Sequence, residues 1–349
     1  MTPAHVAAAF AVQSAACESL GSPFMGRLMR LCATRIWPDT AITDRIFGWE
    51  GAIGPRDQSV PLRLAGALHA LHLQGDPLLA TVYPPRQVSD DALWETVSQV
   101  LTAQTDKIDR WLDSAPQTNE VRRSAVLIAV GHWLADRFGL PIRTSELGAS
   151  GGLNLQWDLY GMDIAGQRFG PEDAALTLTP AWQGPKPPDT PPKVIARAGV
   201  DLNPLDPTDP ADALRLQAYL WPDQPERLSL TRAAIAAAGT RVEKGDAIDW
   251  LAGRLAMQDG VLHLIYSTVA WQYFPETAKT RGTDMIAAAG ARASPSSPLA
   301  WFGMENDGGT RGAALTLRLW PGDQRLALGR ADFHGRWVAW EDPSQGMAC

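Results

Sequence analysis

The spacing of apolar residues divides the chain near residue 140. In residues 1–140 they recur at helical intervals, as in residues 61–73, residues 91–112 and the stretch from Val121 to Trp133. The polar residues 117–120 offer a helix cap before the third stretch, which ends near Gly139. No strand pattern of comparable strength occurs in this part. We therefore predict a helical amino-terminal domain over residues 1–140, acting as a cap and substrate domain.

From residue 141, strand-like and helical stretches alternate, which predicts a mostly parallel sheet covered on both faces. The predicted strands are residues 142–147, 194–201, 241–244, 261–267 and 299–304, and the predicted helices are residues 153–160, 212–220, 229–238, 248–257 and 276–291. Residues 314–340 predict an antiparallel meander. The proline-rich residues 180–192 predict a surface loop, within an insert of about 161–193. The expected fold class is α/β: a Rossmann-like domain over residues 141–349 with a carboxyl-terminal antiparallel meander.

Composition narrows the class of protein. A chain of 349 residues with 45% hydrophobic and 20% charged residues is typical of a folded protein with a sizeable core. Its net charge of −7 argues against general affinity for nucleic acid or anionic membrane. No basic amino-terminal region and no apolar run of roughly 20 residues is present, so we expect a cytoplasmic protein without a membrane span. The pattern leaves the oligomeric state open.

The three cysteines carry no recognisable chemistry. Cys17, Cys32 and Cys349 lack metal-ligand spacing and are too few for a disulfide framework. We expect idle thiols in a reducing compartment and no metal site.

A run of small residues follows the first predicted strand. The spacing Glu146-x-Gly148-x-Ser150-x-Gly152 lies between that strand and a predicted helix, where backbone N–H groups approach a ligand at the positive end of a helix dipole. It resembles the first motif of class I S-adenosylmethionine (SAM) methyltransferases. Gly148-x-Ser150-x-Gly152 also spells the nucleophile elbow of α/β-hydrolases. The loop alone does not choose between them.

Acidic residues recur where the next strands end. Ligands of open parallel sheets bind beyond the carboxyl ends of the strands, where strand order reverses. Asp201 ends the second predicted strand, Asp246 follows the third and Ser267 ends the fourth. This succession resembles the class I methyltransferases motif by motif.

That resemblance implies a SAM site. It implies that Asp201 accepts hydrogen bonds from the ribose hydroxyls, that Asp246 meets the adenine amino group, and that the loop faces the methionine part of the cofactor. The cofactor-binding residues it implies are Glu146, Gly148, Ala149, Ser150, Gly152, Asn154, Asp201, Leu202, Asp246, Ala247 and Ser267.

The segment before the first strand supplies a second group of polar residues. Asn119 and Arg123 are spaced i, i+4, and Glu120 and Arg123 are spaced i, i+3, as on one helix face. A capped helix with a surface ion pair explains this spacing too. In many methyltransferases this segment closes over SAM and substrate, so we expect the three side chains to be shielded and to point toward residues 148–152. Arg123 would then pair with a carboxylate of cofactor or acceptor.

Catalytic candidates lie in this segment and after the fourth strand. Methyl transfer from a sulfonium needs alignment and, for an oxygen or amine acceptor, a proton acceptor. Glu120, Tyr266 and Tyr273 are the candidate proton acceptors, and Trp271 would border the substrate or the sulfonium.

Five ordered strings extend the resemblance over most of the chain. They are Gln-Thr-Asn-Glu-Val-x-Arg-x-Ala at 117–125, Glu-x-Gly-Ala-Ser-x-Gly-Leu-Asn at 146–154, Asp-Leu-Asn-Pro-Leu-Asp at 201–206, Trp-Pro-Asp at 221–223 and Gly-Asp-Ala at 245–247. Together they resemble the bacterial DUF2332 family, which is uncharacterised. The family implies a Rossmann-like part behind a helical front and assigns no activity.

Three functions follow as hypotheses. The first is a SAM-dependent methyltransferase-like protein acting on a small-molecule acceptor. The second is a hydrolase with Ser150 as nucleophile and His334 as base, although such an elbow should follow several earlier strands where this chain is helical, and no His-Gly-Gly loop is present. The third is a non-catalytic Rossmann-like binding or scaffold protein. The loop does not spell the Gly-x-Gly-x-x-Gly of dehydrogenases.

Overall fold

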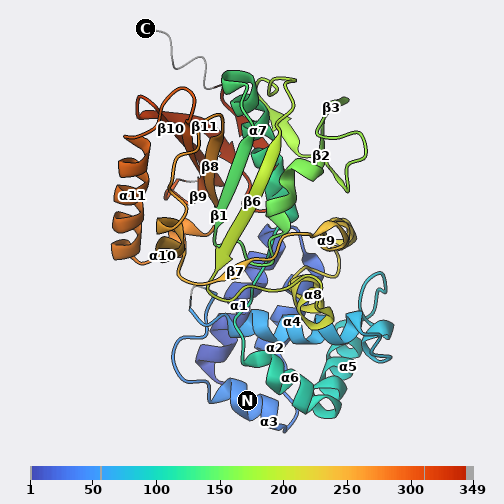
Figure 1. Cartoon of the computed structure of the whole chain (residues 1–349). Coiled ribbons are helices and arrows are strands. Elements are labelled where there is room, and N and C mark those ends of the chain that lie inside the picture. The colour runs from blue at the N-terminus through green and yellow to red at the C-terminus, as the bar shows by residue number, and fades with distance from the viewer. Residues whose placement is uncertain (1, 56, 310, 343–349) are drawn as a thin grey trace. The chain divides into compact units, whose positions relative to one another are not determined.

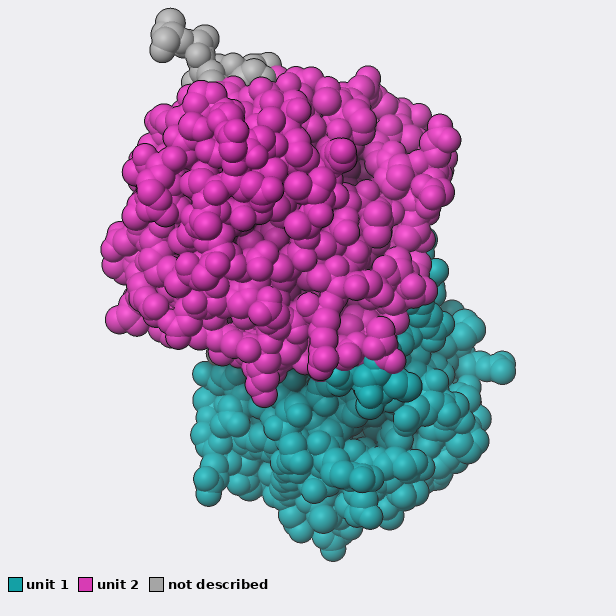
Figure 2. All heavy atoms as spheres, viewed as in Figure 1, with its two compact units in different colours: residues 1–118, 209–232 teal, residues 119–208, 233–349 magenta. Residues whose placement is uncertain are grey.

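The chain forms two compact units (Figure 2). The computed structural model describes residues 2–55, 57–309 and 311–342. Unit 1 comprises residues 1–118 and 209–232, and unit 2 comprises residues 119–208 and 233–349. This division differs from the expected boundary near 140. Residues 119–140 belong to unit 2, where the helix over 124–138 packs on the segment 153–159 that follows the first strand: a Cβ added at Gly131 would lie 2.3 Å from the Trp157 ring.

Unit 1 is helical, as its apolar spacing predicts. Its helices bury one apolar core, which includes Leu28, Leu68 and Leu101. The described helices are α1 (Ala4–Ser19), α2 (Pro23–Thr34), α3 (Ala41–Phe47), α4 (Val60–Leu73), η1 (Leu79–Thr81), α5 (Asp90–Ala103), α6 (Thr105–Leu112), α8 (Pro210–Ala218) and the first part of α9 (Pro225–Ala237).

The segment over residues 209–232 completes unit 1 from far along the chain. The indole of Trp111 donates to the hydroxyl of Tyr219 at 3.0 Å. Asp223 accepts from the Ser22 hydroxyl at 2.5 Å and from the Phe24 amide at 2.9 Å, at the start of α2. The Trp-Pro-Asp string at 221–223 therefore has a structural role, since its carboxylate caps a helix.

Unit 2 contains one large sheet and one small sheet (Figure 1). Among the described residues the large sheet has nine strands in the order β5-β12-β11-β10-β9-β8-β1-β6-β7, and the small one has the order β3-β2-β4. The strands are β1 (Ile142–Leu147), β2 (Gly161–Ile164), β3 (Gln167–Phe169), β4 (Thr177–Leu178), β5 (Ala181–Gln183), β6 (Val194–Asp201), β7 (Glu243–Lys244), β8 (Leu262–Thr268), β9 (Leu299–Glu305), β10 (Ala313–Trp320), β11 (Gln324–Ala331) and β12 (Trp337–Trp340).

The parallel half of the large sheet contains a reversal of strand order. Strands β7, β6, β1, β8 and β9 are parallel neighbours, so the sheet runs third, second, first, fourth, fifth in their chain order. The reversal lies between β1 and β8, which is where open α/β sheets bind ligands. The predicted mostly parallel sheet is confirmed, and so is the meander, because β10, β11 and β12 follow in antiparallel pairing.

Helices cover the sheet on both faces (Figure 1). Helix α7 (Ser124–Phe138), after the short η2 (Val121–Arg123), lies on one face, and α10 (Ala247–Ala252) and α11 (Glu276–Gly290) lie on the other. Leu147 and Ile265 of the strands pack with Ile286 of α11 in a shared core. This packing positions the carboxyl ends of β1 and β8.

Two local predictions need correction. The predicted surface loop 180–192 contains β5, which pairs with β12 at the sheet edge, and the insert before it folds into the small sheet β2–β4. The predicted helix 153–160 is instead the 3₁₀ helix η3 (Leu153–Leu159). Pairing partners far along the chain decided the first case, because a short strand carries little local signal.

No helix of the described residues is long and apolar enough to cross a membrane. Cys17 and Cys32 are buried and form no disulfide, and Cys349 lies outside the described residues.

Candidate functional site

The small-residue loop after β1 has an unusual backbone. Gly148, Ser150 and Gly152 have φ values of 76°, 53° and 70°. This left-handed region is natural for glycine and strained for serine. At Gly148, a Cβ would also lie 2.6 Å from the Cβ of Ala270, which follows β8. The loops after β1 and β8 therefore touch at the point where strand order reverses.

Asp201, at the end of β6, holds this loop in place. Its Oδ2 accepts from the Ser150 amide at 2.9 Å, and its Oδ1 accepts from the Asn203 amide at 2.9 Å. Asp201 is half-buried. Since an ionised carboxylate has about four acceptor positions, it retains capacity for a ligand's hydroxyls. Asp201 thus connects two neighbouring strand ends at the expected cofactor position.

The Ser150 hydroxyl is not arranged as a nucleophile. Its Oγ is buried and has no hydrogen-bond partner within the described residues. The Ser150–His334 contact that a hydrolase requires is therefore not formed. His334 lies in the turn between β11 and β12, where its amide donates to Asp332.

A second serine–histidine pair, deeper in the sheet, is structural. His263 Nε2 lies 2.9 Å from Ser145 Oγ, and Arg143 Nη2 lies 3.2 Å from His263 Nδ1. Because a guanidinium only donates, Nδ1 must accept and Nε2 must carry the ring hydrogen. A ring in that state cannot take the serine proton. Burial, with the charges of Arg143 and Arg254, lowers the pKa of His263 to about 3.

Asparagine side chains join the segment before α7 to the segment after the loop. Asn119 Oδ1 accepts from the Leu153 amide at 2.8 Å, at the start of η3. Asn154 Nδ2 donates to the Glu120 carbonyl at 3.3 Å, and Asn154 Oδ1 accepts from the Ser124 hydroxyl at 2.7 Å. Asn119 therefore occupies the first amide of η3. The sequence predicted that a ligand would bind at the amino-terminal end of a helix dipole after the loop. That position is not available, because η3 is a short 3₁₀ helix and its first amide, that of Leu153, is already bonded to Asn119.

Glu120 and Arg123 are buried as expected, but they do not share an α-helix face. Glu120 caps η2, and its Oε1 accepts from the amide and Nε of Arg122, both at 3.3 Å. Arg123 donates to the Thr268 carbonyl at 3.1 Å and to the Phe333 carbonyl at 2.9 Å. Arg123 thus joins the end of β8 to the β11–β12 turn.

Glu146 lies beneath the loop in a buried polar chain. Its side chain is 1% exposed. The hydroxyl of Tyr266 on β8 lies 3.3 Å from Glu146 Oε2 and 3.2 Å from the Asn154 carbonyl oxygen. Burial raises the pKa of Glu146 well above its usual range, and the charge of Asp201 adds to this; the Tyr266 hydrogen bond and the Arg123 charge oppose it. Tyr266, expected near the acceptor, is fully buried, and burial raises its pKa as well.

The remaining expected residues border the strand ends. Asp246 is exposed and caps α10, since its Oδ1 accepts from the amides of Ile248 and Asp249. Leu202, beside Asp201, is 66% exposed, while Ala247 after Asp246 is buried.

Beyond β8, the aromatic candidates differ in exposure. Tyr273 ends η4 (Trp271–Tyr273) and is 74% exposed. Trp271 packs against Trp301 and Phe274. Tyr273 is thus the candidate proton acceptor that solvent reaches, and Trp271 is part of a packed aromatic cluster.

Sequence reasoning missed two contributors. Glu305, at the end of β9, accepts from the Ser267 hydroxyl at 2.8 Å and from three consecutive backbone amides, those of residues 270–272. The turn over residues 332–336 packs so closely on η2 that a Cβ at Gly335 would lie 2.5 Å from the Arg122 backbone. Neither carries a local signal, because each partner lies far away along the chain.

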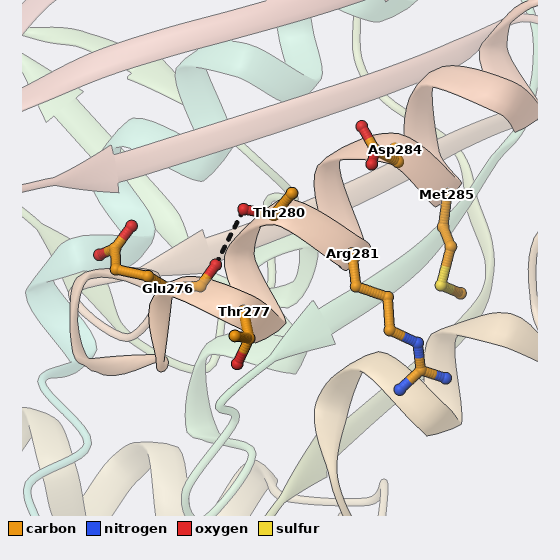
Figure 3. A pocket seen from close by; sticks show the side chains of 6 residues that line it. All are labelled: Glu276, Thr277, Thr280, Arg281, Asp284 and Met285. Atoms are coloured by element: carbon orange, nitrogen blue, oxygen red, sulfur yellow. Dashed lines mark hydrogen bonds between the residues drawn. The ribbon is translucent and has the colours of Figure 1, made fainter.

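An open, shallow surface depression lies elsewhere, along one face of α11. Figure 3 shows its lining side chains, all of them from that helix: Glu276, Thr277, Thr280, Arg281, Asp284 and Met285. It includes no residue of the strand ends. Within the described part of the chain, no group of three or more His, Cys, Asp or Glu side chains could hold a metal ion.

Comparison with known proteins places the chain in one family. Residues 7–340 match the model of a family described as "Uncharacterized protein conserved in bacteria (DUF2332)". No curated protein matches the chain.

Proposed function

The chain belongs to the DUF2332 family, and we propose that it is a SAM-dependent methyltransferase-like protein acting on a small-molecule acceptor. The observation that carries this proposal is the reversal of strand order between β1 and β8, with acidic residues at the ends of β1, β6 and after β7. Ligands of such sheets bind beyond these strand ends. The contact of Asp201 with the Ser150 amide supports a joint role for the loop and this carboxylate.

In this proposal each strand end meets one part of the cofactor. Asp201 accepts from the ribose hydroxyls through its remaining lone pairs, and Leu202 packs against the adenine. Asp246 accepts from the adenine amino group through Oδ2, because its Oδ1 serves the α10 cap. The methionine part lies along the loop of residues 148–152.

Methyl transfer would be an in-line displacement. The acceptor would attack the methyl carbon, and the electron pair of the breaking carbon–sulfur bond would go to the sulfur. Alignment supplies most of the acceleration. For an acceptor that must lose a proton, exposed Tyr273 and buried Glu120 are the candidates.

Calorimetric titration with S-adenosylhomocysteine tests the proposal. We expect the wild-type protein to bind and Asp201→Ala to lose about 1.5–3 kcal/mol of binding free energy, the range for hydrogen bonds to a charged group. Asp163→Ala is the matched control, because Asp163 on β2 makes a comparable bond, to the Gly166 amide, away from the strand ends. Its affinity should equal that of the wild type.

Other results would redirect the assignment. Failure of the wild type to bind SAM and S-adenosylhomocysteine would contradict the proposal. Covalent labelling of Ser150 by a fluorophosphonate would favour the hydrolase, and absence of both reactions would favour a scaffold.

A further inference from the structure

Two arginines meet at the amino-terminal ends of β1 and β8, at the edge of the sheet opposite to the candidate site. Arg143 is the second residue of β1, and it is paired in register with His263, the second residue of β8. Arg143 Nη2 donates to His263 Nδ1 at 3.2 Å, and Arg254 Nε, after α10, donates to Ser145 Oγ at 3.2 Å. The hydrogen bond of 2.9 Å between His263 and Ser145 therefore joins the two guanidinium groups.

Further contacts hold the two arginine side chains close to each other. Arg143 Nη2 also donates to the carbonyl oxygen of Arg254, at 3.3 Å, and to that of Ala256. The Arg254 guanidinium lies over the ring of Trp250 on α10, 4.6 Å from its centroid. Both arginines are half-buried. Two positive charges are thus fixed beside each other at the surface of unit 2.

Neither guanidinium forms an ion pair with a carboxylate among the described residues. Exposed Glu243 on β7 attracts Arg254 only from a longer distance. Burial lowers the pKa of Arg143, and the charge of Arg254 lowers it further. Because like charges repel, the pair is costly unless an anion neutralises it. The cost is notable in a chain with a net charge of −7, which holds carboxylates in excess.

Hydrogen-bond donors also outnumber acceptors at this place. Ser145 Oγ accepts from both His263 Nε2 and Arg254 Nε, and its own hydrogen has no acceptor within the described residues. The buried Nε of Arg143 and the buried Nε1 of Trp250 are likewise unpaired in this part of the chain. Arg143 Nη1 and both Nη atoms of Arg254 make no hydrogen bond there either, but these terminal nitrogens are not buried. A ligand therefore reaches them from solvent.

We propose that Arg143 and Arg254 bind a phosphoryl group, either as free phosphate or on a phosphomonoester. A phosphoryl group carries about two negative charges at pH 7, so it neutralises both arginines, and its several oxygens can meet the terminal nitrogens of both. A carboxylate carries one charge, and a single guanidinium already occupies both of its oxygens. His263 and Ser145 are positioning residues, since they hold the guanidinium groups without meeting the ligand. The site lies apart from residues 148–152 and does not depend on the proposed function.

Calorimetric titration with inorganic phosphate at fixed ionic strength tests the site. We expect the wild type to bind, and Arg254→Gln and Arg143→Gln each to weaken binding about tenfold or more, because each variant loses hydrogen bonds to a charged group. Arg281→Gln is the matched control. It removes one positive charge from the neighbouring α11, where Arg281 is paired with Asp249 at 2.6 Å. Its affinity should stay within about twofold of the wild type, since salt screens charges at longer distance.

Chemical labelling of the wild type gives a second measure, which needs no variant. Phenylglyoxal modifies accessible guanidinium groups, and mass spectrometry of peptides locates the modified residues. At about ten times its Kd, phosphate should slow the modification of Arg143 and Arg254 about tenfold and leave that of Arg281 unchanged. If a glutamine variant does not fold, this protection decides.

The chemistry of the probe identifies the source of the phosphoryl group. Binding of glycerol 3-phosphate as well as phosphate supports a phosphomonoester, and binding of phosphate alone supports the free ion. Absence of phosphate binding, equal weakening in Arg281→Gln, binding of acetate as tight as that of phosphate, or lack of protection of Arg143 and Arg254 overturns the site. None of these results depends on SAM, so failure here leaves the proposed function standing.

Discussion

Glu305 determines the shape of the segment after β8, although it lies on β9. Its carboxylate accepts from the Ser267 hydroxyl and from the amides of residues 270–272, and its side chain is largely shielded. Burial raises its pKa, and these four hydrogen bonds oppose the rise. One carboxylate therefore replaces the backbone pairing that this irregular segment lacks.

Removal of this carboxylate should destabilise unit 2. Glu305→Ala leaves several donors without an acceptor, so we expect a loss of about 2–4 kcal/mol in the free energy of unfolding. Glu305→Gln is the matched control. It keeps one acceptor oxygen but places an NH₂ group, in place of the second oxygen, opposite the Gln272 backbone amide. We expect it to lose about 1 kcal/mol in the free energy of unfolding. Urea denaturation of the three proteins measures this. Equal losses in both variants would show that packing alone matters.

At the scale of elements, the site depends on two loops that approach each other. The loop after β1 and the segment after β8 meet at Gly148 and Ala270, where no room remains for a side chain. Arg123 joins the β8 end to the β11–β12 turn, and Asn119 joins the segment before α7 to η3. The strand ends of unit 2 therefore behave as one packed assembly.

Gly148→Ala tests the close approach of the loops. The substitution combines a left-handed backbone with a Cβ 2.6 Å from that of Ala270, so we expect a loss of about 2–4 kcal/mol in the free energy of unfolding.

Gly166→Ala separates the two causes. Gly166 has a similar φ of 81°, but its added Cβ meets nothing within 4 Å. The Gly166→Ala variant should lose about 1 kcal/mol in the free energy of unfolding, which is the cost of the left-handed backbone alone. Similar losses for both variants, measured by chemical denaturation, would contradict the close approach.

At the scale of the whole molecule, each unit buries a neutral histidine. In unit 1 the Nδ1 of His69 lies 3.1 Å from the Ala218 carbonyl oxygen, and burial lowers the pKa of His69 to about 4. In unit 2 burial lowers the pKa of His263 to about 3. A folded pKa below the unfolded value means that the unfolded chain binds more protons. Stability is then full above about pH 6.5 and falls as the pH drops toward the folded values.

His263 should therefore make unit 2 sensitive to acid. Between pH 7.5 and pH 5 we expect His263 to lower the free energy of unfolding by about 2 kcal/mol, because the loss is about 1.4 kcal/mol for each pH unit below 6.5. The difference between wild type and His263→Gln in denaturation at the two pH values isolates this contribution. His5→Gln is the control, because His5 is exposed. A pH dependence that His263→Gln leaves unchanged would contradict the assignment.

Two parts of the molecule were predictable from local pattern. The bounds of β1 and β6 agree with the predicted strands, because turn-forming residues mark their ends: Pro141 precedes β1, Gly148 follows it, and Asn203-Pro204 follows β6. The helices of unit 1 follow from apolar spacing at helical period. Glycines at 148 and 152 and an acid at 201 also mark the ends of β1 and β6 in the sequence.

Long-range contacts decided the rest. Only the folded chain joins residues 209–232 to unit 1, adds β5 to the sheet edge, and places Glu305 and the β11–β12 turn beside the strand ends. It also turned Asn119 toward Leu153 and enclosed Glu146 with Tyr266. Sequence by itself determined the helices of unit 1 and the bounds of β1 and β6, since periodicity and turn residues act over a few positions. Tertiary structure alone decided which polar groups share hydrogen bonds, because a buried donor takes its acceptor from whichever segment packs against it.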